Sequence, residues 1–202
     1  MTTDPYAKWQ ETYKTRPISA VIDFAKKAAD YLHEQPSASI LDIGCGDGRD
    51  ANFLTEQGFA VTAIDFSDVA IERVKALNPA INAHVMDTTK MDFPDASFDA
   101  IYAHLSLHYF DDTTTTAIFE NIRRMLKPGG LFFVKCKSTK DPYYGVGEEV
   151  GPNMFLHGHL RHLFTPDYMR TQLADFTILT LDETSADYDG KTSAFVEAVA
   201  KK

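Results

Sequence analysis

Three alternating glycines follow a short apolar run, and this turn is the part of the chain best suited to chemistry. The apolar run is residues 40–43, and the glycines are Gly44, Gly46 and Gly48. Such a pattern indicates a strand that ends in a turn and leads into a helix. Glycine lets the backbone approach a ligand closely or adopt a positive φ without a Cβ clash. The turn therefore indicates a nucleotide-like ligand lying against the main chain.

The spacing of the glycines and the acidic residues around them distinguish between two kinds of nucleotide. A dinucleotide fold uses G-x-G-x-x-G, with a helix N-terminus directed at a pyrophosphate. This turn reads G-x-G-x-G, with Asp42 two residues before the first glycine and Asp47 inside the turn. Carboxylates at both places would repel a pyrophosphate but attract a sulfonium compound with a free ammonium group. The turn therefore favours S-adenosylmethionine over NAD.

Four further segments with strand or turn character follow the glycine turn in order. They are residues 61–65, 84–88, 98–110 and 126–134, the last reading L-K-P-G-G-L-F-F-V. Together with the glycine turn, this series resembles the class I S-adenosylmethionine-dependent methyltransferases over nearly the whole chain. It is similar to the small bacterial enzymes grouped with the tellurite-resistance and other small-molecule methyltransferases.

The resemblance implies an α/β fold of the Rossmann-like type. Its seven-stranded, mostly parallel sheet has the order 3-2-1-4-5-7-6, with strand 7 antiparallel and helices on both faces. Helical and strand patterns alternate along the chain, as such a fold requires. Residues 176–181 and 193–199 are predicted strands joined by a hairpin at Asp189-Gly190. Ser67 and Thr165 are predicted N-caps of two helices.

The resemblance also assigns the cofactor to residues at the strand ends. The methionine part would be surrounded by Asp42, Gly44, Cys45, Gly46 and Asp47. The ribose and adenine would contact Asp65, Phe66, Asp87 and Thr88, and Ala103 would face the sulfonium. Asp65 lies 21 residues after Gly44, close to the offset of about 20 at which a carboxylate accepts hydrogen bonds from ribose hydroxyls. The alternatives are a carboxylate that satisfies turn amides for Asp42 and a turn cap for Asp87.

Two histidines are candidate catalytic residues. Methyl transfer is an in-line displacement, so an enzyme mainly supplies proximity, alignment and a dry pocket. A base is needed only when the acceptor must lose a proton, and an imidazole with a pKa of about 6.5 suits that task. His104 and His108 lie in the loop after the predicted fourth strand. Packing is the alternative role for both.

Residues 1–16 form a polar arm that aromatic residues interrupt. In many relatives such an arm folds over the cofactor, where Trp9 or Tyr13 would pack on the sulfonium methyl by cation–π attraction. Arg16 would then pair with the cofactor carboxylate. The alternative is an arm packed on the outside of the sheet.

Residues 138–161 match neither helical nor strand periodicity, and the segment is several times longer than the median connection of about 4 to 6 residues. A structureless loop of this length is usually a lid or a binding loop, and the alternative is a variable surface excursion. The candidate acceptor-binding residues in it are Tyr143, Tyr144, His157, His159 and Arg161. His157, His159 and His162 do not have the spacing of a zinc site, so no metal is expected. The alternatives are recognition of an anionic or polar acceptor by His159, Arg161 and His162, and a solvated turn before the helix that begins at Thr165.

Composition and net charge indicate the cellular compartment of the protein and the kind of molecule that it binds. The 202 residues carry a net charge of −9, which disfavours nucleic acid and favours a small-molecule acceptor. Two cysteines, no leader pattern and no long apolar run predict a cytoplasmic protein that does not contact membranes. We expect a single domain over residues 1–202, as a monomer or a homodimer.

The expected activity is S-adenosylmethionine-dependent methyl transfer to a small molecule. Two alternatives remain open at this point. One is a module that binds the same cofactor without catalysis and works through protein contacts, which would need a blocked acceptor pocket. The other is an NAD-linked oxidoreductase.

Overall fold

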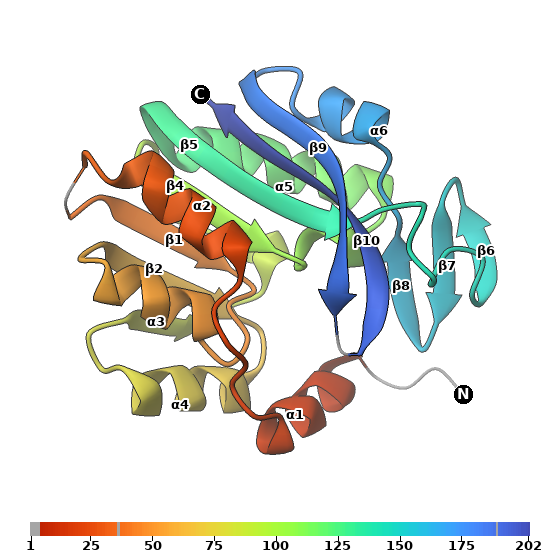
Figure 1. Cartoon of the computed structure of the whole chain (residues 1–202), viewed down its shortest axis with the longest axis horizontal. Helices are drawn as coiled ribbons and strands as arrows, with labels where there is room; N and C mark the ends of the chain where they lie inside the picture. Colours follow the sequence, from red (N-terminus) through yellow and green to blue (C-terminus); the bar gives the residue numbers. More distant parts are fainter. Residues whose placement is uncertain (1–4, 36, 189) are drawn as a thin grey trace.

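A seven-stranded sheet forms the centre of the computed structural model, which describes residues 5–35, 37–188 and 190–202 (Figure 1). The strands are β1 (Ser39–Ile43), β2 (Ala60–Asp65), β3 (Asn82–Val85), β4 (Phe98–His104), β5 (Leu126–Lys137), β9 (Thr177–Tyr188) and β10 (Lys191–Lys201). Their order is β3-β2-β1-β4-β5-β10-β9. Since β9 and β10 are the sixth and seventh strands expected from the sequence, the predicted order is confirmed.

The last strand, β10, runs antiparallel to both of its neighbours in the sheet. β10 pairs antiparallel with β5 on one side and with β9 on the other, whereas β1 to β5 pair in parallel. The pairing of Tyr188 with Lys191 closes a hairpin at the predicted place. Asp189, part of the predicted turn, lies outside the described residues.

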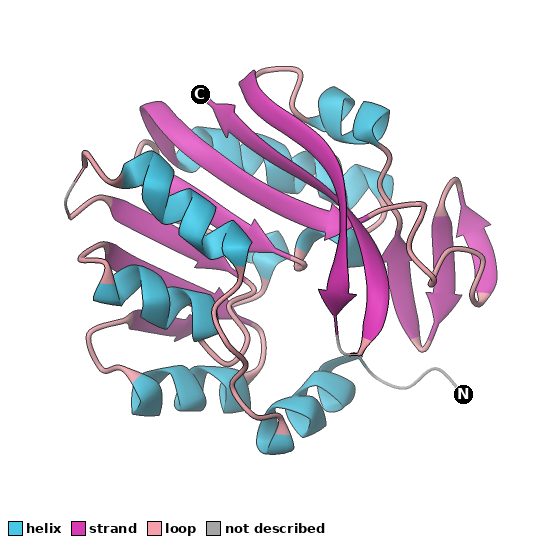
Figure 2. Ribbon diagram, viewed as in Figure 1, coloured by secondary structure: helices cyan, strands magenta, loops and turns pink. Residues whose placement is uncertain are grey.

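Helices cover both faces of the sheet, because alternate residues of each buried strand point to opposite sides. On one face lie α2 (Asp23–Leu32), α3 (Arg49–Glu56) and α4 (Asp68–Leu77), and on the other α5 (Asp112–Met125) and α6 (Pro166–Gln172) (Figure 2). Ile40 belongs to the apolar cluster that contains Phe24 of α2, whereas its neighbour Leu41 belongs to the cluster that contains Phe119 of α5. The predicted N-caps are confirmed, since Ser67 accepts from the Ala70 amide and Thr165 from the Tyr168 amide. Within the described ranges, no helix combines the length and apolarity needed to cross a membrane.

The N-terminal arm is a helix, α1 (Pro5–Thr15), for the part that the structure describes; residues 1–4 lie outside it. α1 packs against the start of α4. The side-chain oxygen of Gln10 accepts from the Ser67 hydroxyl and, at 3.3 Å, from the Val69 amide. Because these donors lie at the N-terminus of α4, Gln10 fixes α1 over the carboxyl ends of β1 and β2.

The expectation that residues 138–161 are structureless is wrong. They contribute a separate antiparallel sheet made of β6 (Glu148–Gly151), β7 (Met154–His157) and β8 (His159–His162). Asn153 and Gly158 take positive φ values of 56° and 73° at the turns between these strands. Strands of only four residues are too short to show a periodicity, which is why the sequence pattern did not reveal them.

The core of the sheet should be most sensitive at β5. Phe132 is fully buried and packs edge to face on Phe119 at 5.4 Å between ring centroids. Phe132→Ala should lower the free energy of unfolding by about 3 to 5 kcal/mol, because it leaves a cavity between β5 and α5. Leu179→Ala, at a side chain that is 43% exposed, is the control and should change it by less than about 0.5 kcal/mol. Equal losses in urea titrations of the two variants would contradict this packing.

Candidate active site

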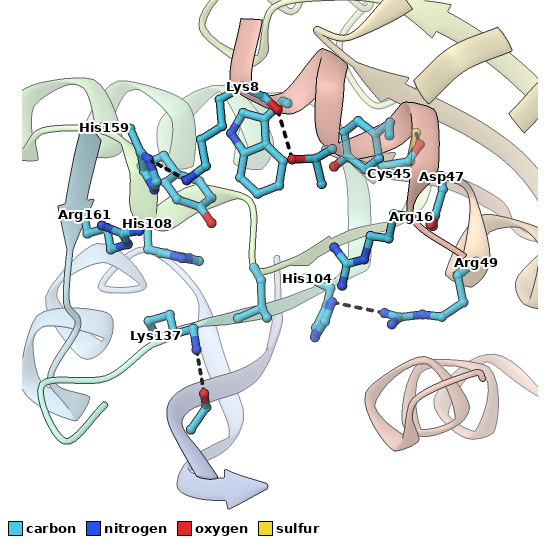
Figure 3. Close-up of a pocket in the computed structure, with 18 of the residues that line it drawn as sticks. Lys8, Arg16, Cys45, Asp47, Arg49, His104, His108, Lys137, His159 and Arg161 are labelled. Atoms are coloured by element: carbon cyan, nitrogen blue, oxygen red, sulfur yellow. Dashed lines mark hydrogen bonds between the residues drawn. The ribbon is translucent and has the colours of Figure 1, made fainter. Parts of the chain in front are cut away.

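A cavity of about 770 Å³ lies at the carboxyl ends of β1, β4 and β5. Its wall is completed by α1, by the segment after β5, by β8 and by the start of β10 (Figure 3). Ligands of open α/β sheets bind at this edge, where the chain leaves the parallel strands. The cavity is large enough for a drug-sized ligand.

The glycine turn forms one end of the cavity. The amides of Gly44 and Cys45 donate to the carbonyl of Ile64 at 2.8 and 3.0 Å, which ties the turn to the end of β2. Gly44 has a φ of +70°, and a Cβ placed on it would lie 2.4 Å from the Cβ of Ser106. Any side chain at Gly44 would therefore force the turn away from the loop after β4.

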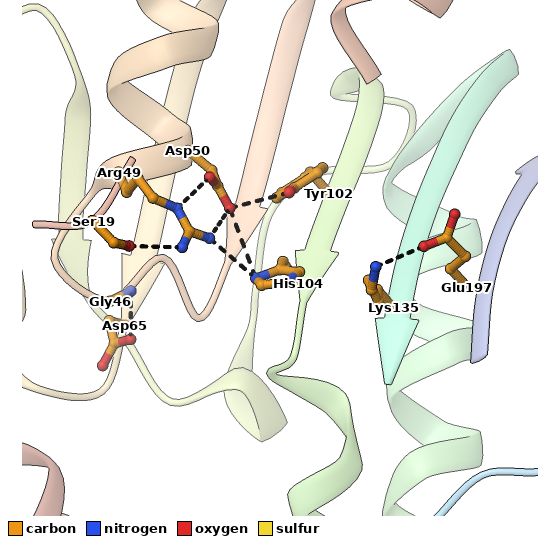
Figure 4. A network of polar contacts seen from close by, with 9 residues as sticks. All are labelled: Ser19, Gly46, Arg49, Asp50, Asp65, Tyr102, His104, Lys135 and Glu197. Carbon is orange, nitrogen blue, oxygen red and sulfur yellow. Dashed lines mark hydrogen bonds and ion pairs between the residues drawn. The ribbon is translucent and has the colours of Figure 1, made fainter. Parts of the chain in front are cut away.

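Asp65 does not line the cavity, and its side chain instead accepts hydrogen bonds from the backbone around the glycine turn. Its two oxygens accept from the Gly46 amide at 3.0 Å and the Ser67 amide at 2.9 Å (Figure 4 shows the first of these). Burial raises the pKa of Asp65, and these backbone donors oppose the rise. The carboxylate at the predicted ribose position thus holds the backbone on which a ligand would rest.

The carboxylate of Asp42 is part of the cavity wall and is almost fully buried. The residue is 2% exposed, and among the described residues its Oδ2 has no hydrogen-bond partner. Burial, together with the carboxylate of Asp50, raises the pKa of Asp42 well above its usual range. A buried carboxylate with an unsatisfied oxygen is unstable unless a cation or donor reaches it. Asp42 is therefore prepared to bind a positively charged group.

Arg49 and Asp50 connect the start of α3 to the end of β4 (Figure 4). The guanidinium of Arg49 donates to both oxygens of Asp50, at 2.7 and 2.8 Å, and Tyr102 donates to the same carboxylate at 3.1 Å. Arg49 also contacts Nδ1 of His104 at 3.4 Å. Burial, followed by the charge of Arg49, holds the pKa of His104 well below 6.5, so its Nδ1 accepts from Arg49.

Two more histidines of the cavity wall are also neutral. His108 is 1% exposed, its Nδ1 has no partner among the described residues, and burial followed by the charge of Lys137 lowers its pKa. Burial and the charges of Arg161 and Lys8 lower the pKa of His159 to about 4. The neutral ring of His159 accepts at Nδ1 from the Lys8 ammonium at 3.1 Å. The wall therefore offers imidazoles as hydrogen-bond acceptors rather than as cations.

The structure brings most of the candidate site residues to this cavity. Those in its wall are Trp9, Tyr13, Asp42, Gly44, Cys45, Gly46, Asp47, His104, His108, Tyr143, His159 and Arg161. Those away from its wall are Asp65, Phe66, Asp87, Thr88, Ala103, Tyr144 and His157. Tyr13 lies against the glycine turn, since its hydroxyl would be 2.9 Å from a Cβ on Gly46. Tyr144 packs instead on Phe155, at 5.1 Å between ring centroids.

Several wall residues had no motif that would identify them. They are Lys8, Ser19, Asp50, Leu105, Lys137 and Asp141. Lys137 ends β5 and donates to Asp141 at 2.9 Å and to Ser193 at 2.8 Å. Leu105 has a φ of +55°, a strained conformation for a bulky residue that is typical of functional loops. The one available signal was position, since Lys137 and Leu105 each lie next to the end of a predicted parallel strand.

The histidines of the β7–β8 region diverge in space. His159 faces the cavity, whereas His162 packs on Tyr168 at 4.4 Å between ring centroids. No group of three or more potential metal ligands occurs within the described ranges.

Comparison with known proteins shows which families the chain resembles. A sequence family described as "Methyltransferase domain" matches residues 40–130, which run from β1 to the start of β5. The match covers slightly less than half of the chain, which is therefore similar to a methyltransferase domain over these residues. Phosphoethanolamine N-methyltransferase 3 of Arabidopsis thaliana is 31% identical over 128 residues, covering 60% of this chain and 26% of that protein. The chain thus spans about a quarter of the length of this relative.

Solved structures share the fold of this chain along nearly all of its length. The 1,6-didemethyltoxoflavin-N1-methyltransferase of Burkholderia thailandensis, solved with its substrate and S-adenosylhomocysteine, is 19% identical, with a TM-score of 0.74 over 98% of this chain and 83% of that one. TehB of Haemophilus influenzae is 17% identical, with a TM-score of 0.73 over 98% of this chain and 66% of that one. The fold expected from the glycine turn and the later strands is confirmed.

The neutral histidines predict a pH dependence of stability. A histidine whose folded pKa is lowered binds its proton only in the unfolded chain, so it destabilises the fold increasingly as the pH falls from 6.5 towards 4. His108→Phe removes one such group and should lose less unfolding free energy over this range than the unchanged protein. His84→Phe, at an exposed position of β3, is the reference for loss of an imidazole.

Histidine NMR signals test the same assignment directly. The midpoint for His159 should lie near pH 4, and those for His104 and His108 should lie below 6.5. An ordinary midpoint for His108 would contradict its burial as a neutral ring.

Proposed function

We propose that the protein transfers the methyl group of S-adenosylmethionine to a small molecule bound in the cavity. The observation that carries this proposal is the buried, unsatisfied oxygen of Asp42 beside the glycine turn. The cofactor has an ammonium group, a cation of the kind that such an oxygen needs. The methyltransferase domain over residues 40–130 and the relative solved with S-adenosylhomocysteine support the same conclusion.

The residues at the glycine turn fit the methionine part of the cofactor. Asp42 would hold the ammonium group, and Gly44 and Gly46 leave the backbone uncovered by side chains of their own. Arg49 and Ser19, which hydrogen-bond each other at 3.1 Å, lie in the same wall and offer donors to the carboxylate. When bound, the cofactor supplies an activated methyl group on a sulfonium.

The adenosine part would need α1 to shift. Asp65 is 4% exposed and does not line the cavity, and Tyr13 lies against Gly46, whose amide donates to Asp65. Asp65 accepts backbone hydrogen bonds from Gly46, Ser67 and Phe66, and a carboxylate oxygen can accept more than one hydrogen bond. Ribose hydroxyls could therefore bind there once Tyr13 moves, and Phe66, Asp87 and Thr88 would follow along the same edge.

His108 is the residue best prepared to accept a proton from an acceptor. Its ring is neutral and its Nδ1 has no partner among the described residues, so in the tautomer with the proton on Nε2 this nitrogen carries a free lone pair. The Nδ1 of His104, by contrast, already accepts from Arg49. Burial of both rings keeps water away from the reacting groups, which favours transfer to the acceptor over side reactions.

The open cavity argues against the two alternatives. A module without catalysis would need a blocked acceptor pocket, whereas about 770 Å³ lies beside His104 and His108. An NAD-linked oxidoreductase would place a pyrophosphate against Asp42 and Asp47, which repel it. Calorimetric titration with S-adenosylhomocysteine and NADH tests both points, and we expect binding of the first alone. A methyl-release assay over a panel of small acceptors then tests catalysis, and cofactor binding without turnover of any acceptor would favour the non-catalytic module.

The glycine turn allows a matched test of cofactor binding. Gly44 and Gly58 both have positive φ, +70° and +94°, but a Cβ clashes at Gly44 and meets nothing within 4 Å at Gly58. Both alanine variants therefore carry similar backbone strain, of about 1 to 2 kcal/mol. Only Gly44→Ala should also abolish binding of S-adenosylhomocysteine in calorimetry. Equal affinity of the two folded variants, checked by circular dichroism, would place the cofactor elsewhere.

A further inference from the structure

The wall opposite the glycine turn contains a buried guanidinium without a carboxylate. Arg161 of β8 is 9% exposed, and within the described ranges no acidic side chain pairs with it. Its contacts are a long 3.5 Å hydrogen bond to the carbonyl of His157 and the ring face of Tyr143 at 4.4 Å. A guanidinium has five N–H donors, and a buried charge is normally paired. Most of this donor capacity remains open to the cavity.

The ammonium group of Lys8, on α1, lies on the same side of the cavity as Arg161 (Figure 3). Lys8 donates to His159 at 3.1 Å, and among the described residues no carboxylate pairs with it either. Burial and the charge of Arg161 both lower the pKa of Lys8, so the two cations repel each other. Figure 3 shows Lys8, His159 and Arg161 on one side of the cavity and Cys45 and Asp47 on the other. A protein with a net charge of −9 would not gather unpaired cations here through composition alone.

We propose that the methyl acceptor carries a carboxylate or phosphate group, and that Lys8, His159 and Arg161 bind this group. The inference rests on the proposed function, because it names the acceptor of the same cavity. An anion between Lys8 and Arg161 replaces their repulsion with two charge-assisted contacts. With its anionic group bound there, the rest of the acceptor would lie beside His108 and extend towards the glycine turn. All three anion-binding residues lie outside residues 40–130, which the methyltransferase domain family matches.

The carboxylate of the cofactor does not explain this cluster. The carboxylate and the ammonium of an amino acid share one carbon atom, so an ammonium held by Asp42 keeps the carboxylate at the glycine-turn end. Arg16, Arg49 and Ser19 line the cavity there. Figure 3 places Arg16 and Arg49 on the side of Asp47, away from Lys8 and Arg161. A second anion is therefore needed to fill the opposite wall.

The single tryptophan of the chain reports on this cluster. The ring of Trp9 lies 6.4 Å from that of His159, and the Lys8 ammonium lies 5.7 Å from the Trp9 centroid. Calorimetry first measures the affinity for S-adenosylhomocysteine. Sodium acetate, sodium phosphate and neutral acetamide are then titrated at constant ionic strength, with and without S-adenosylhomocysteine, while tryptophan fluorescence is recorded. We expect a saturable change with an anion and none with acetamide, and the stronger of the two anions identifies the acceptor group.

Variants test whether the binding occurs at the proposed residues. Loss of one charge-assisted contact in Arg161→Gln should weaken the anion by about 10- to 100-fold. Lys8→Gln, on the exposed side of α1, should also weaken it and does not threaten the core. Arg170→Gln is the matched control, since Arg170 is exposed on α6 and does not line the cavity. In the methyl-release assay, carboxylic acids should be methylated in preference to their carboxamides, and both cavity variants should reduce that preference.

The two proposals fail in different ways. If S-adenosylhomocysteine does not bind, the proposed function is contradicted. The anion titrations carried out in the absence of S-adenosylhomocysteine still measure the anion site in that case. Equal responses to acetate and acetamide, absence of a response to both anions, or unchanged anion affinity in both cavity variants would overturn the anionic acceptor. Preferential methylation of carboxamides by a protein that binds S-adenosylhomocysteine would overturn it while leaving methyl transfer intact.

Discussion

The contact of one buried carboxylate with two loops organises the whole site. Asp65 accepts from the amide of Gly46 in the turn after β1 and from that of Ser67 at the start of α4. The same Ser67 binds Gln10, which holds α1 above the strand ends. Because a carboxylate can accept several donors in its plane, one side chain fixes the glycine turn, the helix behind it and the helix that covers it.

A separation of charge across the cavity follows from this arrangement. The acidic side chains Asp42 and Asp47 lie with the glycine turn, whereas Lys8 and Arg161 lie on the segments that close the opposite side. Burial makes the charges of Asp42 and Arg161 costly to leave unpaired. It also keeps His108 neutral between the two ends. The cavity therefore has acidic side chains at one end and basic side chains at the other, and a neutral imidazole in its wall.

The regular part of the fold was predictable, because its rules are local. Strand alternation, the caps Ser67 and Thr165 and the Asp-Gly hairpin signal depend on neighbours in the chain, and each gave the correct element. The small sheet of β6, β7 and β8 was missed, since four-residue strands carry too little pattern to distinguish them from loop. The helix α1 was missed as well, because its contacts with α4 and with the far wall are tertiary.

By itself, the sequence determined the sheet order, the glycine turn and a carboxylate at Asp65, since these follow from spacing within single strand–turn–helix units and from the family resemblance. Only the tertiary structure decided that Tyr13 rather than Asp65 lines the cavity and that Lys8 meets His159, 151 residues away. It also decided that Tyr144 and His157 lie outside the wall that Arg161 joins. The physical reason is that burial and charge pairing depend on segments distant in the chain, which local patterns do not encode.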